Sequence, residues 1–206
     1  MSITVEEIFG ELYRENLKFG VLRGFKTLQS KDFSYAKDID VLVAPEHFVK
    51  LRSVLKRKGF KVKDDSCFAY EFLYAARPHS HFYHPKLHIH LDVCTVLMVR
   101  SPDAGQFVSL DNEIQLHAFS NLLSIDSYWK KQVDVSTQII HLISHCIYDK
   151  QCFRDEYRIE IIDKISILDD RLTRSLFKLI FFEKAEFILD NLASKNFDFI
   201  EQIFDL

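Results

Sequence analysis

Two aspartates stand two positions apart in the otherwise apolar segment "KDIDVLVAP", residues 37–45. Side chains alternate between the two faces of a strand, so Asp38 and Asp40 point one way while Ile39 and Val41 point the other. Asp is disfavoured in strands, and two ionised carboxylates on one face repel each other. The acidic face therefore needs a positive partner, and a divalent cation held by both carboxylates would supply it.

A third carboxylate comes from the segment "HIHLDVC", which alternates as a strand does. By the same alternation, Asp92 shares one strand face with His88 and His90. We expect Asp92 to converge with Asp38 and Asp40, giving three carboxylates that can hold two Mg²⁺ (or Mn²⁺) ions. Such a site suits phosphoryl or nucleotidyl transfer, in which one ion sharpens the attacking hydroxyl and the other neutralises the triphosphate.

The segment "VLRGF" places Gly24 at the end of an apolar run, fourteen residues before Asp38. Glycine permits a tight turn and a close approach of the backbone, both of which triphosphate binding requires. The interval between the two residues has room for a short helix between two strands.

Local signals around these residues predict alternating helices and strands. Thr4 and Glu7 have capping-box spacing, so a first helix is expected from about residue 4 to 18. Pro45 suits the first turn of a further helix, which Gly59 would end. Strands are expected over residues 19–25, 39–44, 60–63, 67–75 and 84–98.

From about residue 112 onward, helical spacing replaces strand alternation. It recurs in "NEIQLHAFSNLL", "STQIIHLISHCIYDK", "YRIEIIDKISILDD" and "RSLFKLIFFEKAEFILDNLA", and no glycine follows Gly105. We therefore predict an α+β chain in two domains. Residues 1–111 form a small mixed sheet with flanking helices, and residues 112–206 form an all-helical domain.

The order strand, glycine turn, short helix, Asp-x-Asp strand, helix and later strand with one Asp resembles the nucleotidyltransferase superfamily of the DNA polymerase β type. The similarity covers about residues 19–95. It is carried by "VLRGFKTL", "KDIDVLV", "KGFKV" and "HIHLDV", with "HLISHCIYDK" beyond them, as in little-characterised bacterial and archaeal members. The resemblance implies metal-dependent transfer of a nucleoside monophosphate from an NTP to an acceptor. It gives Asp38 and Asp40 two metal-ligand positions, Asp92 the third, and Gly24 the nucleotide-binding turn.

One residue departs from that family's pattern. The family's turn reads Gly-Ser, with the serine hydroxyl on the phosphates, whereas Phe25 follows Gly24 here. Arg23 or Lys26 would then contact phosphate, because either cation can pair with it. The same departure keeps open a catalytically silent nucleotide-binding or regulatory protein on this fold.

The acidic residues also have a purely structural interpretation. Asp38 would be a turn residue, and Asp92 would face solvent. Asp40 would pair with Lys37 or Arg23. The chain could then be a small helical-dimer adaptor whose acidic strand is only surface.

Five histidines lie close together in "RPHSHFYHPKLHIH": His79, His81, His84, His88 and His90. Zn²⁺ binding is an alternative, but no Cys or Glu stands at zinc-site spacing. We expect exposed or hydrogen-bonded histidines, with His90 as a neighbour of Asp92. His141 and His145, four apart on one helix, are expected to be hydrogen-bonded core residues.

Composition constrains partners and location. The formal charge of −3 argues against long nucleic acid, and the basic segment "KRKGFKVK" (residues 56–63) is interpreted as a solvated helix end. Four cysteines without disulfide spacing and the absence of a membrane-length apolar run indicate a cytoplasmic protein with no membrane contact. An NTP and an unidentified acceptor are the expected partners. The apolar segment "LFKLIFFEKAEFILDNL" leaves open a homodimer through the helical region.

Overall fold

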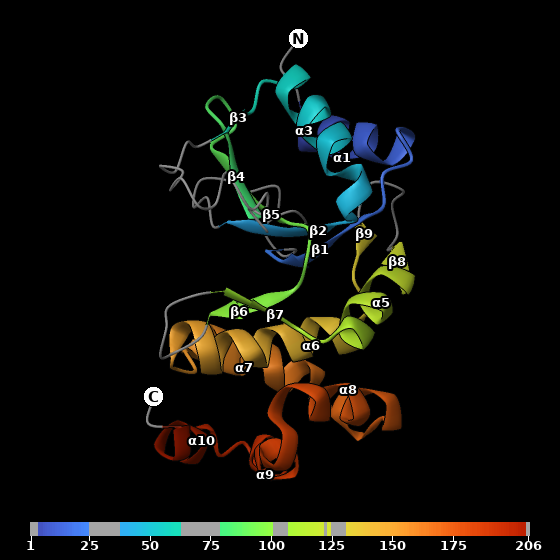
Figure 1. The fold of residues 1–206 in the computed structure, drawn as a ribbon. Coiled ribbons are helices and arrows are strands. Elements are labelled where there is room, and N and C mark those ends of the chain that lie inside the picture. Colours follow the sequence, from blue (N-terminus) through green and yellow to red (C-terminus); the bar gives the residue numbers. More distant parts are fainter. Residues whose placement is uncertain are drawn as a thin grey trace. The chain divides into compact units, whose positions relative to one another are not determined.

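The chain forms two compact units in the computed structural model, which describes residues 4–24, 38–62, 79–100, 107–121, 123–124 and 131–204 (Figure 1). The first unit consists of Met1–Val96 and Asn121–Val133, and the second consists of Leu97–Ser120 and Asp134–Leu206. We expected one boundary, after residue 111, whereas the chain passes between the units three times. The reason is that residues 121–133 return to the first unit and add strands to its sheet.

Helix α1 (Val5–Arg14) begins at the capping box predicted for its first turn. The N–H of Glu7 donates to the Thr4 hydroxyl at 3.2 Å, and the N–H of Thr4 donates to the Glu7 carboxylate at 2.9 Å. The helix ends before residue 18 because the backbone turns at Asn16, whose φ is 54°.

Within the described residues, the first unit contains a seven-stranded sheet with the order β3-β4-β5-β2-β1-β9-β8. Strand β2 runs parallel to β5 and β1 runs parallel to β9, while the other neighbours are antiparallel. The small mixed sheet with flanking helices is thereby confirmed. The strands are β1 (Phe19–Arg23), β2 (Ile39–Val43), β3 (Lys61–Val62), β4 (His79–His84), β5 (Ile89–Cys94), β8 (Leu123–Ser124) and β9 (Lys131–Gln132).

The sheet differs from the predicted one in where β5 begins and in two short strands that were not expected. Strand β5 begins at Ile89 because His88 lies in a turn with a φ of 51°, so His88 is not on the strand that carries Asp92. Strands β8 and β9 occur in a region expected to be helical, and each contains only two residues. The strand predicted over 67–75 and the helix predicted after Gly24 lie outside the described residues.

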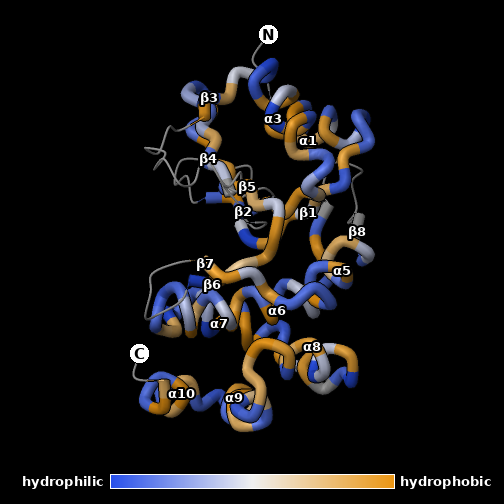
Figure 2. Tube along the Cα trace, in the orientation of Figure 1, coloured by the Kyte–Doolittle hydropathy of each residue, from blue (hydrophilic) through white to orange (hydrophobic). Residues whose placement is uncertain are grey.

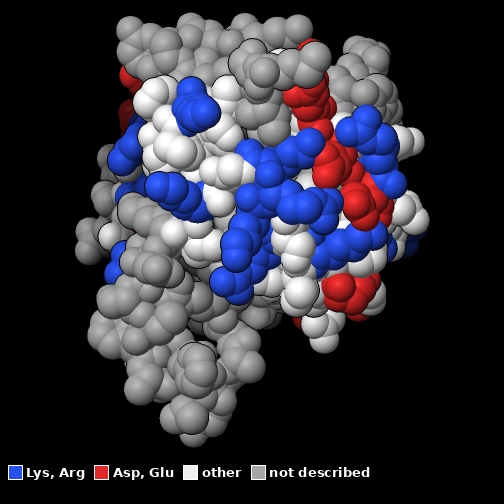
Figure 3. Space-filling model, turned by 90° about the horizontal axis from the view of Figure 1, so that it is seen from above, with Lys and Arg blue, Asp and Glu red and all other residues white. Residues whose placement is uncertain are grey.

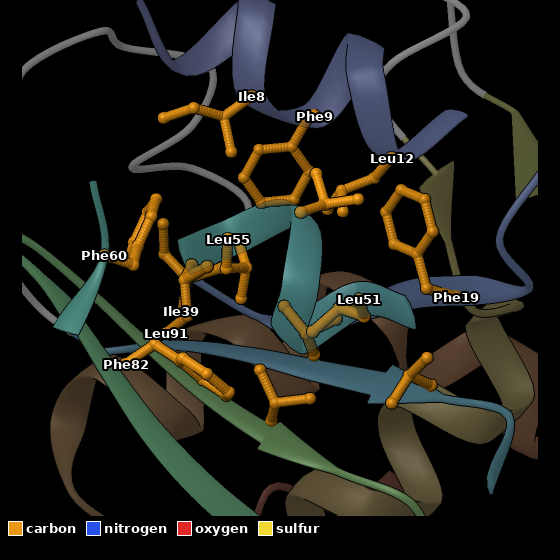
Figure 4. Close-up of a cluster of buried hydrophobic side chains, with 14 of the residues drawn as sticks. Ile8, Phe9, Leu12, Phe19, Ile39, Leu51, Leu55, Phe60, Phe82 and Leu91 are labelled. Atoms are coloured by element: carbon orange, nitrogen blue, oxygen red, sulfur yellow. The ribbon is translucent and has the colours of Figure 1, made fainter. Parts of the chain in front are cut away.

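Helices α1 and α3 (Phe48–Arg57) pack on one face of this sheet, and α3 follows the short helix η1 (Pro45–His47) that begins at the expected proline (Figure 4). Ile39 and Leu91 point into the apolar core beneath the two helices (Figure 4). The core side chains of β2 and β5 are all odd-numbered: Ile39, Val41, Val43, Ile89, Leu91 and Val93. Even-numbered residues of these strands therefore point to the opposite face.

The second unit is built mainly of helices, as the sequence predicted for this part of the chain. A two-stranded sheet, β6 (Met98–Arg100) with β7 (Phe107–Ser109), was not predicted. Hydrophobic and hydrophilic residues alternate along its helices (Figure 2). Among the described residues, no helix combines the length and apolar character that crossing a membrane requires. The helices are α5 (Asn112–Ser120), α6 (Val135–Ser144), η2 (His145–Lys150), α7 (Asp155–Lys164), η3 (Ile165–Asp169), α8 (Arg171–Phe181), η4 (Phe182–Lys184), α9 (Ala185–Ala193) and α10 (Phe197–Phe204).

Candidate functional site

Asp40 and Asp92 lie directly opposite each other on the neighbouring parallel strands β2 and β5. The pair before them in the register, Ile39 and Leu91, is buried in the core under the helices. Strand alternation therefore points both aspartates to the face that carries no helix of this core. Neighbouring strands are about 4.8 Å apart, a spacing that lets two carboxylates reach one cation.

A bulge in β1 brings Arg23 to the same face. Val21 pairs with Val41, and the next described pair joins Arg23 to Asp40, so β1 advances two residues while β2 advances one. Regular alternation would have pointed Arg23 into the core together with Val21. Instead, Nε of Arg23 donates a hydrogen bond to Oδ2 of Asp40, and the two side chains are only 21% and 11% exposed.

This ion pair belongs to the purely structural interpretation of the acidic residues. Another part of that interpretation, a solvent-facing Asp92, does not describe the geometry, because the Asp92 side chain is 27% exposed and lies beside Asp40. In this arrangement the Asp40 carboxylate is paired with the Arg23 guanidinium, and the Asp92 carboxylate lies next to it.

Gly24 follows Arg23 directly and has a φ of 80°, a conformation that L side chains rarely adopt. A Cβ atom at this position would lie 2.9 Å from the carbonyl oxygen of Asp38 and 3.1 Å from Cα of Ile39. The close approach predicted for this glycine is therefore made to the backbone at the start of β2. Lys26, the other predicted phosphate contact, lies outside the described residues.

Asp38 precedes β2 and is the most exposed of the three aspartates, with 64% of its side chain accessible. Its Oδ1 lies 3.8 Å from Nδ1 of His90. His90 and Asp92 lie two residues apart on one face of β5, as expected, and the register also places His81 opposite Asp92, with Nδ1 of His81 3.8 Å from Oδ2 of Asp92. Each of these two aspartates thus has its own histidine neighbour.

An aromatic pair continues this face of the sheet. Tyr83 of β4 is the register partner of His90, and the centroids of the two rings are 4.6 Å apart. The Tyr83 hydroxyl also lies 3.2 Å from Nδ1 of His88. His84 has a structural role, because its ring nitrogens bond to the Lys58 carbonyl at 3.0 Å and to the Leu87 N–H at 3.1 Å.

Cys94 is a residue of this face that the sequence argument missed. It follows Asp92 by two positions on β5, a spacing that could have identified it, and its Sγ donates to the Val41 carbonyl at 3.6 Å. Burial raises the pKa of the Cys94 thiol far above its ordinary value, and the nearby charges of Asp92 and Asp40 raise it further. The raised pKa favours the protonated thiol, which is a poor nucleophile.

The described residues contain no group of three or more His, Cys, Asp or Glu side chains arranged to hold a metal ion. The two opposed carboxylates nevertheless fit Mg²⁺ or Mn²⁺ in chemistry. Mg²⁺ is commonly held by one or two carboxylates together with substrate phosphates and water rather than by a cage of protein ligands. Asp40 and Asp92 supply such a pair.

The two helical histidines lie in the second unit. His145 begins the π-helix η2, and its Nδ1 lies 2.7 Å from Oδ2 of Asp149. The N–H of Arg100 donates to the same carboxylate at 2.5 Å. His141 and His145 are both buried, and their ring centroids are 6.3 Å apart. The geometry of His145 is that of a hydrogen-bonded core histidine.

Comparison with known proteins gives little sequence similarity. No family model and no curated protein matches the chain. Among solved structures, the chain is similar to the solution structure of antibiotic-resistance factor ANT(2'')-Ia, with 11% identity and a TM-score of 0.41. The match covers 97% of this chain and 94% of that chain. Because identity and TM-score are both low, function has to be argued from the side chains of the site.

Proposed function

We propose that the protein is a nucleotidyltransferase that moves a nucleoside monophosphate from an NTP to an acceptor in a metal-dependent reaction. The observation that carries this proposal is the in-register placement of Asp40 and Asp92 on parallel neighbouring strands, with both side chains on one face. Two opposed carboxylates are electrostatically unfavourable in a strand pair unless a cation lies between them. A site that binds a divalent cation with a triphosphate accounts for both residues.

In this proposal Asp40 and Asp92 hold the cation together with phosphate oxygens, and Asp38 completes the acidic set. The bound metal would neutralise charge on the triphosphate and on the departing pyrophosphate. Asp92 would also help to remove the proton of the acceptor hydroxyl. The acceptor must approach the face of the sheet that carries no helix of the core, because all three aspartates belong to it.

Arg23 has a defined part in the same proposal. It is bonded to Asp40 here, and a guanidinium pairs with phosphate as readily as with a carboxylate. Binding of the nucleotide would transfer Arg23 from Asp40 to a phosphate oxygen. Gly24 holds Arg23 at this place, since its positive φ brings the chain against the start of β2.

A second candidate is a catalytically silent nucleotide-binding or regulatory protein. The Arg23–Asp40 ion pair favours it, because a permanent cation on Asp40 would take the place of a metal ion. Phe25 also favours this candidate, because it stands where the nucleotidyltransferases that the sequence resembles have a phosphate-binding serine.

Pyrophosphate release from each NTP, with Mg²⁺ or Mn²⁺, tests the transfer reaction. Asp40→Asn and Asp92→Asn should each lower the rate at least about a hundredfold, since each removes a carboxylate that would hold the metal ion neutralising the departing pyrophosphate. Glu46→Gln is the matched control, because this exposed carboxylate lies in η1 and should leave the rate unchanged. Undiminished release by Asp40→Asn would remove the proposed site.

Calorimetry separates the two candidates. Tight binding of NTP with Mg²⁺ by wild-type protein, without any pyrophosphate release, would support the silent protein. Binding by neither wild-type protein nor Arg23→Gln would contradict both candidates and favour the adaptor.

A homodimer formed through the second unit and a cytoplasmic location also belong to the proposal. Large apolar side chains are exposed in this unit and could be covered by a second copy: Ile159, Leu172, Phe182, Phe199 and Ile203. Among the described residues, Cys94, Cys146 and Cys152 form no disulfide, which suits a reducing compartment. Light scattering on the purified protein tests the dimer.

A further inference from the structure

We propose that the outer face of helix α3 binds the phosphate backbone of a nucleic acid. We call this face the α3 basic surface, and it consists of Lys50, Arg52, Lys56, Arg57 and Lys58. Helix α3 packs on the face of the sheet opposite Asp40 and Asp92, so the α3 basic surface is separate from the candidate site described above. The proposal does not depend on the transfer reaction.

The sequence of this region is strongly basic. Residues 47–63 contain seven Lys and Arg and no Asp or Glu. Leu51, Val54 and Leu55 are buried and anchor α3 in the core. Helical periodicity therefore places the cations on the outer side, where Arg52 and Lys56 are four residues apart and neighbours along the helix.

Figure 3 shows Lys and Arg side chains forming a continuous area on the face of the first unit that carries α1 and α3, with acidic side chains along its border. Part of this charge is balanced by α1. Nζ of Lys50 lies 2.9 Å from Oε2 of Glu15. Nη2 of Arg57 lies 2.9 Å from Oε1 of Glu11, and the ammonium group of Lys58 pairs with the same carboxylate.

The two glutamates remain charged, because their cationic partners stabilise the ionised form. Hydrogen bonds from Lys58 and Arg57 hold the pKa of Glu11 below its ordinary value, and the hydrogen bond from Lys50 does the same for Glu15. The two charged glutamates thus neutralise two of their three cationic partners, which leaves one positive charge in this group. In the part of the chain that the structure describes, no acidic side chain pairs with Arg52 or Lys56, and both are exposed.

Charge is unevenly divided between the two units. The sequence segments of the first unit contain 17 Lys and Arg and 13 Asp and Glu, a formal charge of +4. The segments of the second contain 10 and 17, a formal charge of −7. The net charge of −3, from which we argued against long nucleic acid, therefore averages a basic unit and an acidic one.

The chemistry of the α3 basic surface favours nucleic acid over other acidic partners. Binding to a phosphate backbone is dominated by Lys and Arg contacts and needs no apolar centre. A protein interface normally has an apolar or aromatic core, and a membrane-surface helix has an apolar face that enters the lipid. Val49 is the one large apolar side chain exposed on the described outer face of α3.

Fluorescence anisotropy with a short labelled single-stranded RNA tests the proposal over a range of salt concentrations. Wild-type protein should bind with strong salt dependence. The double variant Arg52→Gln/Lys56→Gln should bind at least about tenfold more weakly, and the negative slope of log K against log salt should become shallower by roughly 1.4, since each phosphate contact contributes about −0.7.

The matched control is Arg171→Gln/Lys184→Gln, which removes the same charge from exposed positions of the second unit. It should bind as the wild type does. Equal weakening by both double variants would show that RNA binding depends on the net charge of the protein and not on the α3 basic surface, and would overturn the proposal. RNA binding that the α3 variant leaves unchanged, or binding of wild-type protein to anionic vesicles but not to RNA, would overturn it as well.

Discussion

The guanidinium of Arg23 and the carboxylate of Asp40 form an ion pair across a bulge in β1, on the sheet face opposite the core helices. Asp92, on strand β5 at the other edge of β2, is the register partner of Asp40. One cation therefore lies next to a pair of opposed carboxylates in a part-buried site, and this arrangement has measurable consequences for stability and for activity.

Arg23→Gln should lower the free energy of unfolding by about 1–2 kcal/mol, because Asp40 would keep its charge in a part-buried position beside Asp92 without its cation. Urea denaturation measures the effect. Arg52→Gln, an exposed change on α3, is the control and should change stability by less than about 0.5 kcal/mol. Combining Arg23→Gln with Asp40→Asn should recover part of the loss, and strict additivity of the two changes would contradict the coupling.

Asp92→Asn should raise the free energy of unfolding by up to about 1 kcal/mol, because it removes one of two like charges on directly opposed strand positions. The same variant should lose pyrophosphate release, so stability and activity should change in opposite directions. Denaturant titration next to Glu46→Gln gives the comparison. A destabilised Asp92→Asn would mean that the carboxylate is needed for folding rather than for ligand binding.

Gly24→Ala should cost more stability than Gly59→Ala, by about 1 kcal/mol. Both glycines have positive φ, but the new Cβ at position 24 meets the backbone oxygen of Asp38 at 2.9 Å. At position 59 it meets the side chain of His84 at 3.1 Å, and a side chain can move aside. Thermal unfolding of the two variants compares them, and equal losses would show that conformational strain alone decides the outcome.

Asp170 should contribute stability that is lost in acid. The backbone N–H of Thr173 donates to its carboxylate at the N-terminus of α8, which holds the pKa of Asp170 below its ordinary value of 3.8. A lowered folded-state pKa means that the contribution is fully present above pH 3.8 and is lost as the pH falls through the lower value. Asp170→Asn retains a cap and should reduce the acid sensitivity of unfolding, whereas Asp163→Asn, an exposed change on α7, should not.

Alternation of apolar and acidic residues was enough to predict the face of the sheet on which Asp40 and Asp92 meet. The pattern works because both strands bury one side under the same helices. The bulge that turns Arg23 to this face was not predictable, because it depends on the pairing of β1 with β2 and not on local composition.

Other features were missed for related reasons. Strands β8 and β9 have only two residues each, too few for any periodicity, and they exist through pairing with each other and with β1. The return of residues 121–133 to the first unit follows from that pairing. Conversely, the capping box at the start of α1 was predicted correctly, because it is a local interaction between Thr4 and Glu7.

The extra residue in β1 also decides which changes of length this strand tolerates. Inserting one residue between Val21 and Arg23 would carry Arg23 one position past Asp40 and shift Gly24 off its contact with Asp38, whereas deleting Leu22 would remove the bulge and still leave Arg23 on the face of Asp40. An insertion that preserves every side chain here should therefore be more damaging than the deletion.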